Sequence, residues 1–307
     1  MLTWPAKTRT RAMRVLIASG KGGAGKTTVT ASLARVWPGA LVLADADAEA
    51  PNLALYVPGA ELTSQEVTMK VPGAIDYERC SDCGKCLDVC QFKAIARLGE
   101  RIVAFSNMCH GCGACFALCE ENAIEEDSRL LGHLFVKQGE QTPVLIEARS
   151  KIGEAMTPPL LRELNSQALA LCEAADADLL MDAPPGVSCP VMTAARACEA
   201  IVLVAEPSPF GFYDLGLALQ AFEQTAKPVA IVLNRAGLPQ AREIEEKIHA
   251  LCECKQIPIL GVLPFDRAAA QQYSDSKVLA DMDATWKARF ESIAQKLIAW
   301  VKEVEHA

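Results

Sequence analysis

The chain has 307 residues, 51% of them hydrophobic and 22% charged, and a formal net charge of −8. This length can bury the core of one large domain or two smaller ones, and the acidic balance argues against general nucleic-acid binding. No uncharged apolar run approaches the length that spans a bilayer, and the basic lead-in over residues 1–13 has no secretory apolar core after it. We therefore expect a cytoplasmic protein without membrane attachment.

A glycine-rich loop follows the first predicted strand, residues 15–18, and precedes a helical pattern over residues 29–36. Between them the sequence SGKGGAGKTT matches the G-x4-G-K-[ST] phosphate loop, and this setting disfavours a chance glycine turn. Glycines let consecutive amides turn inward around a polyphosphate at the positive end of a helix. Lys26 is expected to neutralise phosphate oxygens and Thr27 to hold Mg2+. The predicted nucleotide-binding residues here are Gly22, Gly23, Gly25, Lys26, Thr27 and Thr28.

Lys21 directly follows the first glycine of this loop. The resulting pattern, Gly-Lys-Gly-Gly-x-Gly-Lys-Thr-Thr, resembles the deviant phosphate loop of the MinD, ParA, Mrp and nitrogenase iron-protein family. In that family the second lysine reaches across a dimer interface to the partner's nucleotide. The resemblance therefore implies an ATP-dependent homodimer, with catalytic roles for Lys21 and Lys26.

Two aspartates, Asp45 and Asp47, end the next short apolar strand, residues 41–44. Open α/β sheets place their ligands at this edge. The family resemblance implies that Asp47 orients the attacking water. Capping of the next helix by a loop carboxylate is the structural alternative for both residues.

The cysteines are concentrated in an internal repeat. Of thirteen cysteines, eight lie within residues 80–119, and residues 80–95 match residues 109–124, each with the spacing C-x2-C-x2-C-x3-C. Disulfides do not persist where a cytosolic nucleotide-binding protein resides, so the repeat indicates metal binding. In such a repeat three cysteines hold one [4Fe–4S] cluster and the fourth ligates the other cluster. The first cluster is therefore assigned Cys80, Cys83, Cys86 and Cys119, and the second Cys109, Cys112, Cys115 and Cys90.

This segment resembles the bacterial two-cluster ferredoxin, except that Gln91 and Glu120 stand where that family usually has proline. Two zinc sites are the alternative, but structural zinc favours two C-x2-C pairs separated by a longer loop. Ten acidic and five basic residues lie between Asp76 and Asp127. An acidic rim of this kind would steer basic redox partners.

A second switch segment is predicted at residues 178–186, where an apolar strand ends in Asp182 and a Pro-Pro-Gly turn. Asp182 is expected to hold a water on Mg2+, and the Gly186 amide to reach the γ-phosphate. Cys189 follows at the offset of a bridging cluster cysteine in the nitrogenase iron protein, but no second ligand is found. Cys189 is interpreted as a packing cysteine, with a functional thiol as the alternative.

The remaining strands are predicted at residues 201–205, 229–233 and 259–264. The loop that follows the first of these resembles the family's segment near the dimer face, with Asp214 as a helix N-terminal carboxylate. The resemblance implies that Asn234 reads the adenine edge and that Pro264 and Asp266 close the base pocket. Cys252 and Cys254 are placed on a helix-to-strand connection, without a ligand role. The last helix, residues 286–304, is expected to dock on the core, because its acidic residues suit a membrane helix poorly.

These features predict an α/β P-loop NTPase with a mostly parallel sheet, over residues 1–60 and 144–307, and an inserted two-cluster ferredoxin domain over 61–143. The leading hypothesis is an ATPase whose dimerisation and hydrolysis gate electron transfer to a redox or metal-cofactor partner protein. The alternatives are a cluster carrier or scaffold and a redox-switched positioning ATPase.

Overall fold

The structure, a computed structural model, describes residues 12–139, 142–274 and 277–305, so almost all of the predicted lead-in lies outside the described residues. The chain forms two compact units. The first comprises Met1–Gln65, Leu134–Arg149 and Leu161–Ala307, and the second Glu66–His133 and Ser150–Leu160. Each unit is described below by itself.

A nine-stranded sheet with the order β11-β10-β9-β1-β8-β2-β7-β6-β3 is the main element of the fold. Its strands are β1 (Arg14–Ala18), β2 (Leu41–Asp45), β3 (Ala60–Ile75), β6 (Ile124–Gln138), β7 (Val144–Ser150), β8 (Asp178–Asp182), β9 (Ala200–Ala205), β10 (Val229–Ala236) and β11 (Ile259–Pro264). The α-helices that lie wholly or mostly in the first unit are α1 (Lys26–Val36), α4 (Thr157–Ala175), α5 (Cys189–Ala195), α6 (Pro209–Glu223), α7 (Arg242–Lys255), α8 (Arg267–Ser274) and α9 (Ala284–Glu305).

The central strands are parallel and buried on both faces, which explains their continuous apolar sequences. β1 pairs with β8 and β9, and β2 pairs with β7 and β8. Because parallel strands bring their carboxyl ends to one edge, Asp45 lies directly opposite Asp182 in the register. The predicted α/β class and parallel sheet are confirmed.

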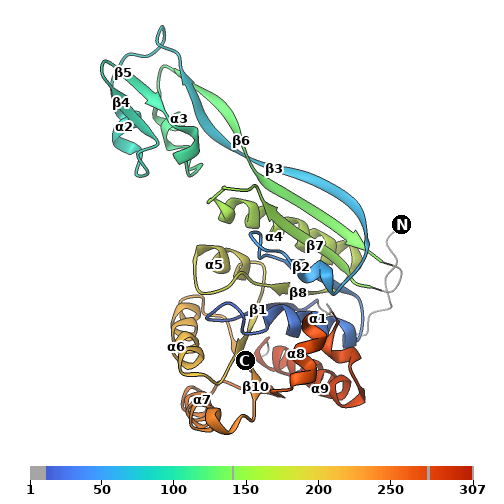
Figure 1. The fold of residues 1–307 in the computed structure, drawn as a ribbon. Helices are drawn as coiled ribbons and strands as arrows, with labels where there is room; N and C mark the ends of the chain where they lie inside the picture. The colour runs from blue at the N-terminus through green and yellow to red at the C-terminus, as the bar shows by residue number, and fades with distance from the viewer. Residues whose placement is uncertain (1–11, 140–141, 275–276, 306–307) are drawn as a thin grey trace. The chain divides into compact units, whose positions relative to one another are not determined.

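Helix α9 docks on the first unit as predicted. Trp286, Phe290, Ile293, Leu297 and Val301 are buried at helical spacing and join a core with β-strand and α1 residues. Figure 1 shows α9 beside α1 and α8; α8 and α9 have the orange and red of the C-terminal part of the chain, and α1 is blue. Within the described residues no helix is both long and apolar enough to cross a bilayer.

Two long strands, β3 and β6, run side by side (Figure 1), and neither is predicted from the sequence. Most of the first half of β3 is exposed, and burial then alternates through Val67, Met69 and Val71. Such an edge strand needs no continuous apolar run, so it lacks the signal that identified the central strands. Both strands extend the nucleotide-fold sheet and continue into the second unit.

The second unit contains a two-stranded antiparallel sheet and two short helices. These are β4 (Ile95–Leu98), β5 (Arg101–Ala104), α2 (Lys85–Val89) and α3 (Ala114–Leu118). Its small core is built from Ile75, Ile95, Ile102 and Ile124, against which several repeat cysteines pack.

Candidate functional site: a phosphate loop and two cysteine-lined cavities

The phosphate loop connects β1 to α1 and ends in two glycines with left-handed backbone angles. Gly23 has φ 77° and Gly25, the N-cap of α1, has φ 97°. A side chain would be strained at both positions, so the sequence uses glycine here. Lys26 is the first residue of α1 and is 7% exposed. The loop therefore presents amides and a cation at the positive end of an eleven-residue helix, which suits a polyphosphate.

Asp182 lies against the start of α1 through two hydroxyl groups. Thr27 Oγ1 donates to its Oδ2 at 2.5 Å, and Thr30 Oγ1 lies 3.4 Å from its Oδ1. Burial raises the pKa of Asp182 from 3.8 to about 6, although the Thr27 hydrogen bond and the Lys26 charge oppose this rise. A hydroxyl and a carboxylate are hard oxygen ligands, so Thr27 and Asp182 fit Mg2+.

Asp45 caps the start of the short 3-10 helix Leu53–Leu55, which was the structural alternative to a ligand role. Its carboxylate accepts the amides of Asp47, Asn52 and Leu53 at 2.9 to 3.1 Å. Burial and the charge of Asp182 raise the pKa of Asp45 well above its usual range. Its hydrogen bonds hold the loop that carries Asp47.

Asp47 is half-buried, and burial raises its pKa while the charge of Lys26 lowers it. The same lysine charge acts on Asp182. The structure thus brings Lys26, Thr27, Asp47 and Asp182 together, which was predicted for the catalytic site.

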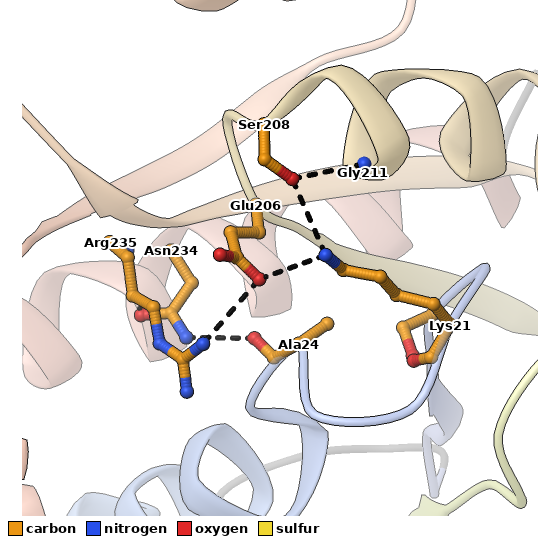
Figure 2. A network of polar contacts seen from close by, with 8 residues as sticks. Lys21, Ala24, Glu206, Ser208, Gly211, Asn234 and Arg235 are labelled. Carbon is orange, nitrogen blue, oxygen red and sulfur yellow. Dashed lines mark hydrogen bonds and ion pairs between the residues drawn. The ribbon is translucent and has the colours of Figure 1, made fainter. Parts of the chain in front are cut away.

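Lys21 is held within its own chain. Its Nζ lies 3.2 Å from Glu206 Oε2 and donates to Ser208 Oγ at 3.3 Å (Figure 2). Glu206 also pairs with Arg235, and Ser208 caps α6 by accepting the Gly211 amide. The lysine that the resemblance directs toward a partner's nucleotide is therefore bound here to the loop after β9.

The prediction that Asp214 is a helix N-terminal carboxylate is wrong, because Ser208 is the N-cap of α6 and the first turn of this helix has no acidic residue. The backbone of Asp214 instead contacts the phosphate loop, since a side chain on Gly20 would collide with the Asp214 carbonyl. Gly186, with φ 83°, also approaches this loop: a Cβ placed on it would lie 4.0 Å from the Gly20 oxygen. The predicted second switch therefore faces the phosphate loop.

The residues predicted for the base pocket also have roles in holding the fold together. Asn234 Nδ2 donates to the Ala24 carbonyl at 2.8 Å, which joins the end of β10 to the phosphate loop (Figure 2). Pro264 ends β11. Asp266 accepts the Ala268 and Ala269 amides at 2.7 and 3.3 Å and so caps α8.

The repeat cysteines of the second unit line two separate cavities. The first, of 60 Å3, is lined by Cys80, Cys83, Cys86 and Cys119, and the second, of 20 Å3, by Cys90, Cys109, Cys112 and Cys115. Each cavity thus combines three cysteines of one repeat with the fourth of the other, as the spacing predicted. All thirteen cysteines of the chain are free thiols.

The two repeats share one backbone conformation at an offset of 29 residues. Left-handed residues recur in three equivalent pairs: Asp82 and Gly111, Gly84 and Gly113, and Lys93 and Asn122. The fourth cysteines also match, because Ala94 N donates to Cys90 Sγ at 3.2 Å and Ala123 N to Cys119 Sγ at 3.3 Å. Thiols around a cavity and amides directed at sulfur are, by their chemistry, the donors that an iron–sulfur cluster takes.

Within the described residues, no three His, Cys, Asp or Glu side chains are grouped so that they could hold a metal ion. The geometry therefore shows neither the predicted clusters nor the zinc alternative. Both assignments remain predictions from the donor residues.

The remaining cysteines are scattered. Cys189 is exposed and begins α5, so the packing role predicted for it is not seen in the monomer. The helix-to-strand placement of Cys252 and Cys254 is wrong, because both lie inside α7, the first buried and the second exposed.

The side chains that hold these residues in place, above all Thr30, Glu206 and Ser208, are not predicted from the sequence. Thr30 lies one helical turn after Lys26 and accordingly shares its face of α1. Glu206 immediately follows β9, at the sheet edge where the other site residues lie. That strand-end position was the available signal.

Residues 15–279 match the nucleotide binding domain family of CobQ, CobB, MinD and ParA, named CbiA. Two proteins of Methanocaldococcus jannaschii, both described as uncharacterized, are similar to the chain. MJ0578 is 27% identical over 93% of this chain and 96% of its own length. MJ0579 is 30% identical over 74% of this chain and 81% of its own length.

Solved structures share the fold. MinD from Pyrococcus horikoshii, in complex with Mg-ADP, has a TM-score of 0.54 at 17% identity and covers 93% of this chain and 96% of its own. MinD from Aquifex aeolicus has a TM-score of 0.55 at 15% identity, covering 94% and 98%. The match to the family extends over most of the chain and includes the phosphate loop, Asp47 and Asp182. The chain therefore belongs to the CobQ/CobB/MinD/ParA nucleotide-binding family and is a P-loop ATPase.

Proposed function

We propose that the protein is an ATPase whose nucleotide-dependent dimerisation gates electron transfer through two [4Fe–4S] clusters to a partner protein, in the assembly or reduction of a metal cofactor. The observation that carries this proposal is the pair of cavities, each lined by four free thiols from a repeat with one backbone geometry. When bound, each cluster supplies a site that takes up and gives up one electron.

The nucleotide site supports the ATPase half of the proposal. Loop amides at the start of α1 and Lys26 hold the phosphates, while Thr27 and Asp182 hold Mg2+. Asp47 orients the attacking water from a half-buried position near the Lys26 charge. Asn234, Pro264 and Asp266 form the side of the site that receives the base. The Gly186 amide senses the γ-phosphate from beside the loop.

Lys21 supports a dimer that depends on ATP. Its ion pair with Glu206 is partly solvent-exposed, at 28% and 23% for the two side chains. Pairs of this kind contribute roughly 1 kcal/mol or less. A triphosphate presented by a second subunit carries more charge than one carboxylate, so it competes for Lys21 and favours the dimer.

The test uses anaerobically prepared full-length protein, reduced with dithionite. The rate at which duroquinone reoxidises it is measured with and without Mg-ATP, for the wild type and for Lys26→Ala. We expect ATP to change the wild-type rate and not the rate of the variant. Equal rates under all conditions would refute the coupling, and a preparation without iron and acid-labile sulfide would refute the clusters themselves.

The same preparation separates the two alternatives. A carrier transfers its iron to an apo-acceptor protein, whereas clusters held by all eight thiolates remain bound during the assay. A positioning ATPase sediments with lipid vesicles or DNA when ATP is present.

A further inference from the structure

The shared backbone of the two cysteine repeats makes their side chains directly comparable. Residues 29 positions apart occupy equivalent places beside the first and the second cavity. The first cavity is lined by Ser81, Lys85, Glu120 and Glu121 in addition to its cysteines. The equivalent residues of the other repeat are His110, Ala114, Gln91 and Phe92, and all of them except Gln91 line the second cavity. The charged positions of the first site are therefore uncharged or aromatic at the second.

Ion pairs lie at the first cavity and beside one of its cysteines, since Lys85 and Glu120 line the cavity and Asp82 precedes Cys83 in the sequence. Lys85 Nζ lies 2.5 Å from Glu120 Oε1, and Arg97 pairs with Asp82 at 2.8 Å. These side chains are between 39% and 79% exposed. A protein that covered this surface would have to desolvate four charges, and the attraction between them would not repay that cost.

An aromatic pair lies at the second cavity. Phe92 and His110 both line it, and their rings are stacked 3.6 Å apart with an interplanar angle of 4°. Phe92 is nevertheless 44% exposed, so one side chain faces both the cavity and the solvent. Lys70 also lines this cavity and pairs with Glu126 at 2.7 Å.

The loop leading into the second cavity is also less charged than its counterpart. Met108 precedes Cys109 and is 48% exposed. The first repeat has Arg79 at this position, and its Nε pairs with Asp76 at 2.5 Å. Exposed aromatic and methionine side chains are enriched at protein interfaces, where they contribute most of the binding energy.

We propose that the Phe92–His110 stack is the docking surface for the electron-transfer partner, and that electrons enter or leave the module through the second cysteine site. The inference rests on the proposed function. The partner is a redox protein that presents an uncharged, apolar surface around its own cofactor. Covering the stack buries apolar area, and because both rings line the cavity it places the partner one side chain away from it.

The experiment exchanges equivalent residues of the two repeats. Phe92→Glu gives the second site the residue of the first, Glu121→Phe makes the reverse exchange, and Phe92→Ser removes the ring without adding charge. The probe is duroquinone, a neutral apolar acceptor that takes two electrons and two protons to become the hydroquinone. Each reduced cluster loses one electron, so one fully reduced protein converts one quinone. Binding of the neutral dye Nile red to the cluster-loaded protein provides a readout that is independent of electron transfer.

We expect both Phe92 variants to slow reoxidation by duroquinone and to weaken dye binding by about tenfold, the loss that removal of one large apolar contact causes. Glu121→Phe should not lower either quantity. Unchanged rates and dye binding in both Phe92 variants would overturn the docking surface, as would an equal loss in Glu121→Phe. Iron and sulfide contents are measured for every variant, so that absence of clusters from the wild type counts against the proposed function instead.

Discussion

Replacement of Asp182 by asparagine should stabilise the nucleotide-free protein at neutral pH. Burial raises the pKa of this carboxyl from 3.8 to about 6. The folded state therefore retains the proton between these pH values while the unfolded chain releases it, and stability falls as the pH rises through this window. Each pH unit costs about 1.36 kcal/mol, so the buried carboxylate destabilises the fold by about 3 kcal/mol at pH 7. Asparagine removes this term and can still accept the Thr27 hydrogen bond.

The assay is urea unfolding of the wild type and Asp182→Asn between pH 5 and 8, without nucleotide and then with Mg-ADP. Without nucleotide the advantage of the variant should grow from below about 2 kcal/mol at pH 5 to about 3 kcal/mol at pH 7. With Mg-ADP the order should reverse, because the carboxylate then holds the cation and the amide cannot. A variant that is less stable than the wild type at pH 7 without nucleotide, or a difference that does not depend on pH, would refute the reasoning.

Three further predictions concern other parts of the molecule. Glu206→Gln should release Lys21 from a contact of roughly 1 kcal/mol in each subunit and lower the protein concentration needed for the ATP-dependent dimer by up to about thirtyfold in sedimentation experiments; unchanged or weaker dimerisation would contradict this. Cys119→Ser should remove roughly half of the bound iron because it completes the first repeat's ligand set, whereas Cys189→Ser should remove none; equal iron contents would contradict the ligand assignment. Phe290→Ala should cost about 3–5 kcal/mol in urea unfolding, because this ring of α9 is fully buried; a loss below about 1 kcal/mol would show that α9 is not docked.

The sequence predicted those parts of the molecule that local chemistry determines. The central parallel strands are apolar along their whole length, so residues 15–18 and 201–205 carry the signal of burial on two faces. The phosphate loop needs glycine at left-handed positions, and Gly25 at φ 97° meets that need. The cysteine repeat fixes which thiols can share a cavity because a short loop limits where three of them can lie.

Contacts between distant segments could not be predicted in the same way. Lys21 is bound by Glu206, a residue 185 positions away, and no local pattern selects that partner over a second subunit. Asn234 donates its side-chain amide to the Ala24 carbonyl, a contact with a distant segment that no local pattern predicts, while its role in reading the base stays a prediction. The connection predicted for Cys252 and Cys254 is wrong because helix α7 extends to Lys255, before its left-handed cap at Gln256. The end of a helix is the part that a sequence pattern defines least well.

The arrangement of β3 and β6 has a consequence for protein engineering. The two strands are neighbours in the sheet, and beyond their ends the Asp76 amide donates to the Ala123 carbonyl at 2.8 Å. The segment that carries all eight repeat cysteines thus enters and leaves through adjacent chain positions, as a graft at the tip of a hairpin does. Excising residues 77–122 and closing the gap with a tight Asn-Gly turn would restore an uninterrupted ribbon. Such a shortened chain would allow the hydrolase to be assayed without the eight repeat cysteines, and the same junction would accept a foreign redox module.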